Sequence, residues 1–372
     1  MRIVHCFRSP VGGIFRHVRD LCEAQVAAGH EVGLVCDSTT GGAFEDQLFA
    51  EIGTKLKLGV ARTPMQRHVG PGDVAAAWRT LRIIRRMRPD VLHGHGAKGG
   101  AYARLFGTAL RMSGRRVARI YSPHGGSLHY DAHTLTGRFF FMLEALMGRI
   151  TDHILFVSQY EQRAYEQKVG MPHAPATLVY NGLRAAEFEA VADAPDAADF
   201  LYIGMMRDLK GPDLFLDALR ETEQRTGRAV SAVMVGDGDD RPKYVTQAEA
   251  LGFGERVAFR PAMPARQAFA LGRIMVVPSR AEAMPYIVLE ALAARKILIA
   301  TAVGGIPEIF GQNSPALAAP SVSSLAEKMA AALADEAAFR AIMPPENDLR
   351  TRFGADVMAK KIEAIYGETL RT

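Results

Sequence analysis

Two glutamates eight positions apart, Glu282 and Glu290, flank the predicted start of a helix. Residues 274–277 are a short apolar run that predicts a buried strand, and Pro285 suits the opening helical position, where its missing N–H group costs nothing. The free N–H groups of a first helical turn attract an anion such as a diphosphate, and carboxylates accept hydrogen bonds from sugar hydroxyls. This segment therefore predicts a site for both halves of a nucleotide sugar. The alternative is that Glu282 caps the helix and that Glu290 lies in solvent.

Two cations stand just before another predicted helix, in the segment from Gly204 to Asp213. This segment follows the first predicted strand of the second half, and Pro212 is placed to open the helix. Arg207 can hold phosphate oxygens with its planar fork of N–H groups, and Lys210 can act as a point charge. Together they could neutralise a diphosphate leaving group without a metal ion. The alternative is an ordinary solvated basic turn.

Two loops of the first half carry further candidate residues. Gly12 and Gly13 follow the first predicted strand and would let backbone N–H groups approach a phosphate or a sugar, although a glycine pair alone is typical of any tight turn. The sequence around them is not a GxGxxG fingerprint. His124 lies at the carboxyl end of a predicted strand before two glycines, where its imidazole could hydrogen-bond a sugar hydroxyl or the reacting centre.

Two groups of residues are of metal-binding type, but neither predicts a metal site. His93 and His95 lack a third Cys, His or carboxylate at suitable local spacing, so we expect them to be hydrogen-bonded or solvated. Asp237 and Asp239 form a DxD pattern, which in enzymes of another fold holds a divalent ion with a nucleotide diphosphate. Here two glycines and a following proline favour a tight turn into a helix. We therefore expect no metal ion and no other cofactor.

Short β-branched runs alternate with helical patterns throughout the chain, which predicts an α/β fold of parallel sheets covered by helices on both faces. The two halves each resemble a Rossmann-type unit, with a turn at residues 180–183 and an Ala/Asp-rich stretch at residues 187–199 between them. Residues 355–370 have helical apolar spacing. The predicted strands are residues 3–7, 32–36, 91–93, 117–121, 154–157 and 177–179 in the first half, and 200–204, 230–235, 257–259, 274–277 and 297–300 in the second.

Length and composition describe a globular protein with room for two domains. The chain has 372 residues, of which 48% are hydrophobic and 23% are charged, which excludes a mostly disordered protein. No apolar run approaches the length needed to span a bilayer, and the start lacks the features of a secretory signal. We therefore expect a cytoplasmic location. Cys6, Cys22 and Cys36 have no metal-ligand spacing and are expected to be reduced, buried thiols.

The net charge of +5 is unevenly distributed, because residues 1–180 hold 23 Lys and Arg against 14 Asp and Glu, whereas the remainder hold 22 against 26. Five arginines crowd residues 78–88, where apolar residues supply the other side of a predicted helix. An ordinary solvated basic face explains this cluster, and so does contact with an anionic membrane surface or a lipid diphosphate. Nucleic acid is not expected, because aromatic residues are not interleaved with the basic ones.

With these pieces in order, the sequence resembles a family 4 glycosyltransferase over nearly its whole length. The resemblance rests on the order and spacing of several motifs rather than on any one of them. They are Gly12-Gly13, Ser122-Pro123-His124-Gly125, Gly204 with Arg207 to Gly211, Val235-Gly236-Asp237-Gly238, and Glu282-x7-Glu290 continuing to Thr301 to Glu308. In place of the glycine-rich loop common in the family after the first glutamate, this chain has Ala283-Met284-Pro285-Tyr286.

The resemblance implies a GT-B fold, in which two Rossmann-like domains face each other across a cleft. Residues 1–181 would bind the acceptor, residues 182–354 the nucleotide sugar, and residues 355–372 would form a helix packing across both domains. It further implies that Arg207 and Lys210 hold the diphosphate, Glu290 the ribose, Glu282 the donor sugar, and His124 the sugar near the reacting centre. The other predicted substrate-binding residues are Gly12, Gly13, Ala283, Met284 and Pro285.

For such enzymes the resemblance implies retention of configuration by front-face displacement, in which the departing diphosphate takes the acceptor's proton. The predicted function is transfer of a sugar from a nucleotide-diphosphate donor to a lipid-linked glycan or polysaccharide precursor, with possible peripheral contact at the cytoplasmic face of an anionic membrane. The acceptor type is inferred from the basic first half and from residues 139–143, an apolar segment that is expected to be core rather than membrane-facing. The alternatives are a nucleotide-sugar epimerase or hydrolase of the same fold, and a non-catalytic nucleotide-sugar-binding protein.

Overall fold

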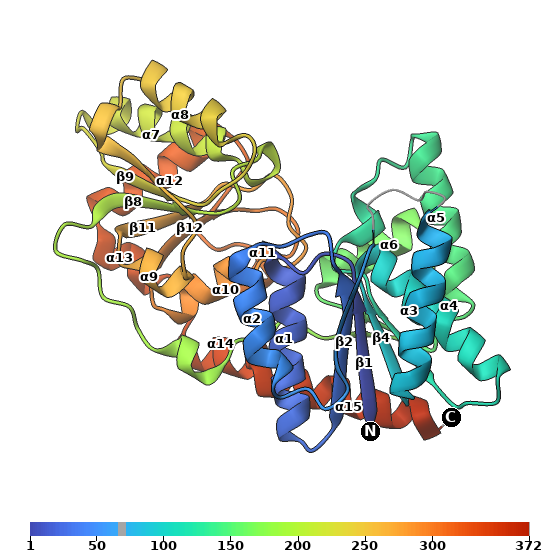
Figure 1. Cartoon of the computed structure of the whole chain (residues 1–372). Coiled ribbons are helices and arrows are strands. Elements are labelled where there is room, and N and C mark those ends of the chain that lie inside the picture. The colour runs from blue at the N-terminus through green and yellow to red at the C-terminus, as the bar shows by residue number, and fades with distance from the viewer. Residues whose placement is uncertain (66–71, 372) are drawn as a thin grey trace. The chain divides into compact units, whose positions relative to one another are not determined.

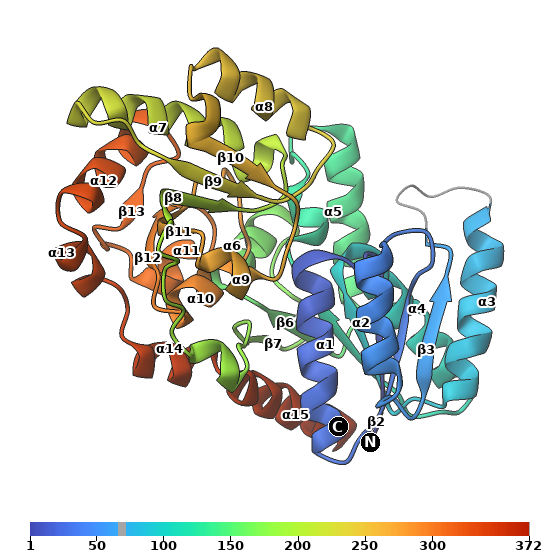
Figure 2. The same cartoon turned by 60° about the vertical axis from the view of Figure 1, so that its left-hand side comes forward.

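The computed structural model describes residues 1–65 and 72–371, which fold as two compact units (Figures 1 and 2). The first unit comprises Met1–Gly182 and Gly354–Thr372, and the second comprises Leu183–Phe353. Each unit contains one parallel β-sheet with helices on its faces, so the predicted α/β class with two Rossmann-like units is confirmed.

The first unit is built on a seven-stranded sheet of order β3-β2-β1-β4-β5-β6-β7. The order reverses between β1 and β4, and at such a switch point the loops after the strands leave room for a ligand. The strands are β1 (Arg2–Phe7), β2 (Glu31–Asp37), β3 (Gly59–Thr63), β4 (Val91–His95), β5 (Ala118–Ser122), β6 (His153–Phe156) and β7 (Ala176–Leu178).

Helices cover both faces of this sheet, because its central strands are apolar on both sides. Figure 1 shows α1 and α2 on one face and α3 and α4 on the other. Phe15 and Ile52 pack with β1 and β2 on the first face, whereas Ile84 and Phe106 pack with β1 and β4 on the second. The helices are α1 (Gly12–Ala27), α2 (Ala43–Gly53), α3 (Gly72–Met87), α4 (Gly96–Met112), η1 (Gly126–His129), α5 (Leu135–Gly148), α6 (Gln159–Lys168) and α15 (Ala355–Arg371).

The last helix, α15, returns to the first unit. Its apolar residues Met358, Ile362 and Tyr366 pack with Ile3 and Ile120 of the sheet. The sequence predicted a helix across both domains, and the chain here passes from the first unit after Gly182 and returns after Phe353. Contact of α15 with the second unit stays a prediction.

The second unit is built on a six-stranded sheet of order β10-β9-β8-β11-β12-β13. Its strands are β8 (Ala198–Ile203), β9 (Ala232–Val235), β10 (Val257–Arg260), β11 (Gly272–Val277), β12 (Ile297–Thr301) and β13 (Leu317–Ala318). Its helices are η2 (Ala185–Phe188), η3 (Asp208–Lys210), α7 (Pro212–Thr226), α8 (Arg241–Ala250), η4 (Gly254–Arg256), α9 (Ala265–Phe269), α10 (Tyr286–Ala293), α11 (Ile306–Phe310), α12 (Val322–Ala334), α13 (Glu336–Ala341) and α14 (Glu346–Phe353). Phe215 of α7, Tyr244 of α8 and Met329 of α12 belong to one core with the strands, and α10 packs on β12.

Two details of the fold differ from the sequence predictions. Helix α10 begins at Tyr286, and Pro285 is its N-cap with extended backbone rather than its first helical residue. The apolar segment at residues 139–143 was expected to be core, but Phe139 is 55% exposed and Met142 is 64% exposed. They lie on the outer face of α5, so the expectation was wrong for these two residues. Phe141 of the same segment is 5% exposed and belongs to the core, as expected. Cys6, Cys22 and Cys36 are buried free thiols, as predicted.

Candidate active site

The loops that follow β8 and β11 bring a lysine and a glutamate into direct contact. Lys210 ends the short helix η3, and its Nζ donates to Oε1 of Glu282 at 2.5 Å. Since β8 and β11 are neighbours in a parallel sheet, their carboxyl ends lie at the same edge. The two residues are 72 positions apart in the chain, and the pairing of β8 with β11 brings them together.

Glu282 is held in place by a chain of hydrogen bonds. The hydroxyl of Ser279 donates to Oε1 of Glu282 at 2.7 Å, and the hydroxyl of Thr301 donates to the carbonyl oxygen of Ser279 at 2.5 Å. Thr301 is the last residue of β12, so three adjacent strand ends contribute to this arrangement. The Glu282 side chain is only 8% exposed, and its carboxylate is therefore fixed before any ligand arrives.

Two glycines permit the close approach of these loops. A Cβ atom on Gly211, which has φ +69°, would lie 2.1 Å from the carbonyl oxygen of Pro278. A Cβ atom on Gly304, which has φ +60°, would lie 1.6 Å from the carbonyl oxygen of Glu282. Both positions need glycine for conformation and for space. The guanidinium of Arg280 also pairs with both oxygens of Asp213, which ties the β11–α10 loop to α7.

Arg207 stands at the N-cap position of η3 with its side chain exposed. Over the described ranges 1–65 and 72–371, it forms no ion pair with a carboxylate. Its charge is therefore available to an anionic ligand beside Lys210. A guanidinium in this position suits phosphate oxygens, which it can bind through two parallel N–H groups.

The remaining predicted residues of this segment follow Glu282 directly. Met284 and Pro285 are buried, and Ala283 is half-buried. Glu290 lies within α10 and is half-buried, so the predicted placement of the two glutamates outside and inside one helix is correct.

The DxD segment forms a tight turn. Oδ2 of Asp237 accepts a hydrogen bond from the backbone N–H of Ala262 at 2.8 Å, and its carbonyl oxygen accepts from Met206 N–H. A Cβ atom on Gly238 would lie 2.5 Å from the carbonyl oxygen of Met206. The segment thus supports the neighbouring β8–α7 loop, in agreement with the predicted turn.

In the first unit, His124 follows β5 with a left-handed backbone, φ +50°. Non-glycine residues seldom adopt this conformation, and it often marks a functional position. The next residue, Gly125, donates its N–H to Oε1 of Glu161 at 2.5 Å, which anchors the turn. Nε2 of His124 lies 3.0 Å from Nδ1 of His95.

His124 belongs to a group of histidines that the sequence treated as separate. His93 contacts the hydroxyl of Tyr366 at 2.6 Å and that of Ser122 at 2.8 Å, so it is hydrogen-bonded as expected. His5 bridges Nε2 of His95 at 3.0 Å and Oε1 of Gln25 at 2.8 Å. Five imidazoles therefore lie close together near strands β1 and β4, and each is buried or half-buried. We call them the histidine cluster: His5, His17, His93, His95 and His124.

Gly12 and Gly13 form the first turn of α1, directly after β1 and its loop. Both are exposed, and Gly12 has φ +67° with nothing within 4 Å of the position that a Cβ atom would take. The glycines therefore leave the backbone N–H groups of this helix start open to a ligand.

Two family profiles together match most of the chain. The profile of Glycosyltransferase Family 4 matches residues 11–187, and that of Glycosyl transferases group 1 matches residues 197–335. The chain is a family 4 glycosyltransferase.

Known relatives of this glycosyltransferase agree with that assignment. A phosphatidylinositol N-acetylglucosaminyltransferase subunit from Arabidopsis thaliana is 24% identical over 97% of this chain and 79% of its own length. Glycogen synthase from Mycobacterium tuberculosis is 24% identical over 88% of this chain and 84% of its own length. Among solved structures, Anabaena Alr3699/HepE in complex with UDP and glucose has a TM-score of 0.78 at 17% identity, with 99% of each chain covered. These likenesses confirm the GT-B fold.

The sequence predicted the charged residues of this site but not the residues that hold them in place. Thr301 and Gly304 lie in a motif that supported the family resemblance, but neither they nor Ser279 were assigned a role, because that role depends on β11 and β12 being neighbours. The signal available in the sequence was the three-residue spacing of Ser279 and Glu282, which permits a local side-chain hydrogen bond.

Proposed function

We propose that this glycosyltransferase retains configuration and transfers a sugar from a nucleotide-diphosphate donor to a lipid-linked glycan or polysaccharide precursor, without a metal ion. The observation that carries the proposal is the Lys210–Glu282 contact at the carboxyl edge of the second sheet. The ammonium group of Lys210 can bind the diphosphate of a sugar nucleotide, and the carboxylate of Glu282 can accept hydrogen bonds from its sugar. The similar Anabaena protein, whose structure is a complex with UDP and glucose, supports a donor of this class.

The reaction places most of its new charge on the leaving group. The bond between the anomeric carbon and the diphosphate oxygen breaks, and the acceptor oxygen bonds to the same face of that carbon. The departing diphosphate oxygen takes the acceptor's proton, so the products are a glycoside and a nucleoside diphosphate. Arg207 and Lys210 would stabilise the departing charge, which makes catalysis mainly electrostatic and positional.

Glu282 and Lys210 would bind different parts of the donor. With a donor bound, Lys210 would contact both a phosphate oxygen and Glu282, whose second oxygen can accept a hydrogen bond from a sugar hydroxyl. Glu290 would accept hydrogen bonds from the ribose. On the acceptor side, Gly12, Gly13 and His124 would contact the acceptor and the transferred sugar.

A thermal-shift screen of UDP-, GDP- and ADP-sugars tests the donor class. We expect one base to raise the melting temperature, because a ligand that binds only the native state at about 100 times its Kd stabilises by about 2.7 kcal/mol. The active donor should then release its diphosphate only when a prenyl-diphosphate-linked sugar is added, and NMR of the product should show the donor's anomeric configuration. Rapid turnover without acceptor would instead indicate a hydrolase or an epimerase.

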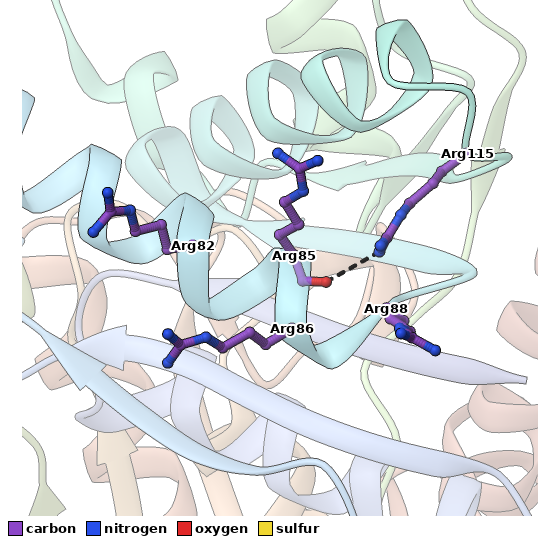
Figure 3. A pocket seen from close by; sticks show the side chains of 5 residues that line it. All are labelled: Arg82, Arg85, Arg86, Arg88 and Arg115. Carbon is purple, nitrogen blue, oxygen red and sulfur yellow. Dashed lines mark hydrogen bonds between the residues drawn. The ribbon is translucent and has the colours of Figure 1, made fainter.

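The first unit has two surface features that suit a lipid-linked acceptor. A hollow of about 470 Å³ is lined by Arg82, Arg85, Arg86, Arg88 and Arg115 (Figure 3). The side chain of Arg115 donates to the carbonyl oxygen of Arg85 at 3.0 Å, which brings it to the end of α3 (Figure 3). Five guanidinium groups with no carboxylate in the lining attract anions such as lipid phosphates.

The second feature is an apolar stripe on α5. Its residues are spaced by four, three and four positions and therefore share one helix face: Leu135, Phe139, Met142 and Leu146, which are 85%, 55%, 64% and 58% exposed. Exposed Arg138 and Arg149 flank this stripe. An apolar helix face beside basic residues suits the interface of an anionic membrane. Along residues 1–65 and 72–371, no helix has both the length and the apolar character to cross a bilayer.

Vesicle flotation tests this membrane contact. The wild type should float with vesicles containing phosphatidylglycerol and much less with pure phosphatidylcholine. Replacing Phe139 and Met142 by serine should weaken binding by about tenfold or more, because each large side chain contributes about 1.5–3 kcal/mol when fully buried. Met171→Ser removes another exposed methionine of the first unit and should have no effect. Equal flotation of the stripe variant and the control would contradict the proposed contact.

A further inference from the structure

Three members of the histidine cluster have the arrangement of a metal-binding triad. The ligand nitrogens of His17, His95 and His124 all lie within 4.8 Å of one another. Their ring centroids are 4.7 Å apart for His17 and His124, 5.3 Å for His95 and His124, and 5.5 Å for His17 and His95. Three imidazoles on a tetrahedral zinc ion, with Zn–N distances of about 2.0–2.1 Å, have nitrogens about 3.3 Å apart. The triad is therefore within a small side-chain adjustment of that geometry.

The outer hydrogen bonds of the triad also suit a metal ion. Nδ1 of His17 contacts Oδ1 of Asn181 at 3.1 Å, and Nε2 of His95 contacts His5 at 3.0 Å. His5 in turn contacts Oε1 of Gln25 at 2.8 Å. If each of these ring nitrogens donates its proton outward, Nε2 of His17 and Nδ1 of His95 keep lone pairs for an ion. Metal-bound histidines usually donate their second N–H in this way, which fixes the tautomer.

The alternative triad of His5, His93 and His95 is less suited to an ion. Its ligand atoms also lie within 4.8 Å of one another. However, both ring nitrogens of His93 already contact hydroxyl groups, Tyr366 at 2.6 Å and Ser122 at 2.8 Å. Ligation by this triad would break one of these His93 hydrogen bonds and also the His5–His95 contact at 3.0 Å, which costs free energy. Ligation by His17, His95 and His124 breaks the 3.0 Å contact between His95 and His124 and keeps those of His5 and His93.

We propose that His17, His95 and His124 bind a divalent transition-metal ion of the zinc class. A water molecule would complete the tetrahedron on the side of His124, which is half-buried whereas the other two ligands are buried. His124 is also the residue expected beside the transferred sugar. If the proposed function holds, an ion on Nε2 of His124 restrains this residue, so the metal acts as a reversible inhibitor of transfer.

Cobalt and zinc titrations of the full chain test the site. After chelator treatment, Co²⁺ should bind one ion per chain and give the intense visible absorption of tetrahedral cobalt, and Zn²⁺ should displace it. His17→Gln should weaken binding by about a hundredfold, and Asn181→Ala by about 10–100-fold, as expected for an outer hydrogen-bond partner. His153→Gln, which changes a half-buried histidine outside the cluster, should leave binding unchanged.

Some outcomes would overturn the assignment. Equal cobalt affinity in wild type and His17→Gln would exclude the triad, and so would binding that is lost in His93→Asn but kept in His17→Gln. Absence of cobalt binding by the folded wild type would also exclude it, with folding checked by circular dichroism. These readouts need no transferase activity, so they are independent of the proposed function. The inhibitory role requires in addition that Zn²⁺ slows transfer by the wild type and that EDTA restores the rate, with neither effect in His17→Gln.

Discussion

Replacement of Lys210 by alanine is expected to lower kcat by about a hundredfold or more, as loss of a charge contact made in the transition state typically does. Lys210 combines a fixed position, given by its 2.5 Å contact with Glu282, with a side chain that is still 26% exposed. Its ammonium group is therefore both oriented and accessible to a diphosphate. Arg207→Ala should lower kcat by a similar factor, because the guanidinium of Arg207 stabilises the negative charge on the same departing diphosphate.

Controls separate catalysis from folding in this experiment. Lys210→Ala leaves the buried Glu282 carboxylate without its cation, so melting temperatures of all variants should be measured alongside kcat. Lys243→Ala breaks a solvent-exposed pair with Asp208, at 2.6 Å, and should leave kcat within about twofold of wild type, since such surface pairs contribute about 0–1 kcal/mol. Wild-type kcat in both Lys210→Ala and Arg207→Ala would refute the assigned roles.

Gly304→Ala should damage the same site through the backbone. The added Cβ atom would stand 1.6 Å from the carbonyl oxygen of Glu282, so the β11–α10 loop must move away. A displacement of about 1 Å in a catalytic group can lower the rate about a hundredfold. We expect a fall in kcat of this order, together with weaker donor binding and a lower melting temperature.

Gly227→Ala is the matched control for this substitution. Gly227 lies in the same unit with φ +65°, close to the +60° of Gly304, and nothing lies within 4 Å of its Cβ position. In both variants alanine must adopt a left-handed backbone conformation, which costs about 1–2 kcal/mol. Only in Gly304→Ala does the new Cβ atom also collide with the carbonyl oxygen of Glu282. Equal kcat and equal donor affinity in the two variants would mean that the position of Glu282 does not matter for the reaction.

The sequence predicted the strands of both sheets except β3 and the two-residue strand β13. Residues 274–277 and 297–300 are continuous apolar runs, and they are central buried strands in the structure. Strand β3 (Gly59–Thr63) was missed, because four of its five residues are only half-buried and its apolar pattern is correspondingly weak. The exposed face of α5 was misjudged for a different reason: residues 139–143 are apolar together, and only the helix turns some of them outward.

The residues of the candidate site were predictable from the sequence where the charged residues lie within one segment of the chain. Arg207 and Lys210, and likewise Glu282 and Glu290, are close in sequence and carry their own signals. The histidine cluster could not be found in this way, since His5, His17 and His124 lie far in the chain from the His93–His95 pair. The pairing of β1 with β4 places His5 opposite His93, and this register is a property of the sheet rather than of any local motif.

The most direct test of the central claim is calorimetric titration of nucleoside diphosphates into the full chain. We predict that one of UDP, GDP and ADP binds at a single site in the wild type. In Arg207→Ala/Lys210→Ala, affinity should fall by about a hundredfold or more, because hydrogen bonds to charged groups contribute about 1.5–3 kcal/mol each. Arg86→Ala, in the arginine-lined hollow of the first unit, should bind like the wild type. Unchanged affinity in the double variant, or no binding of any of the three nucleotides to the wild type, would contradict the claim that the second unit holds a nucleotide-diphosphate donor.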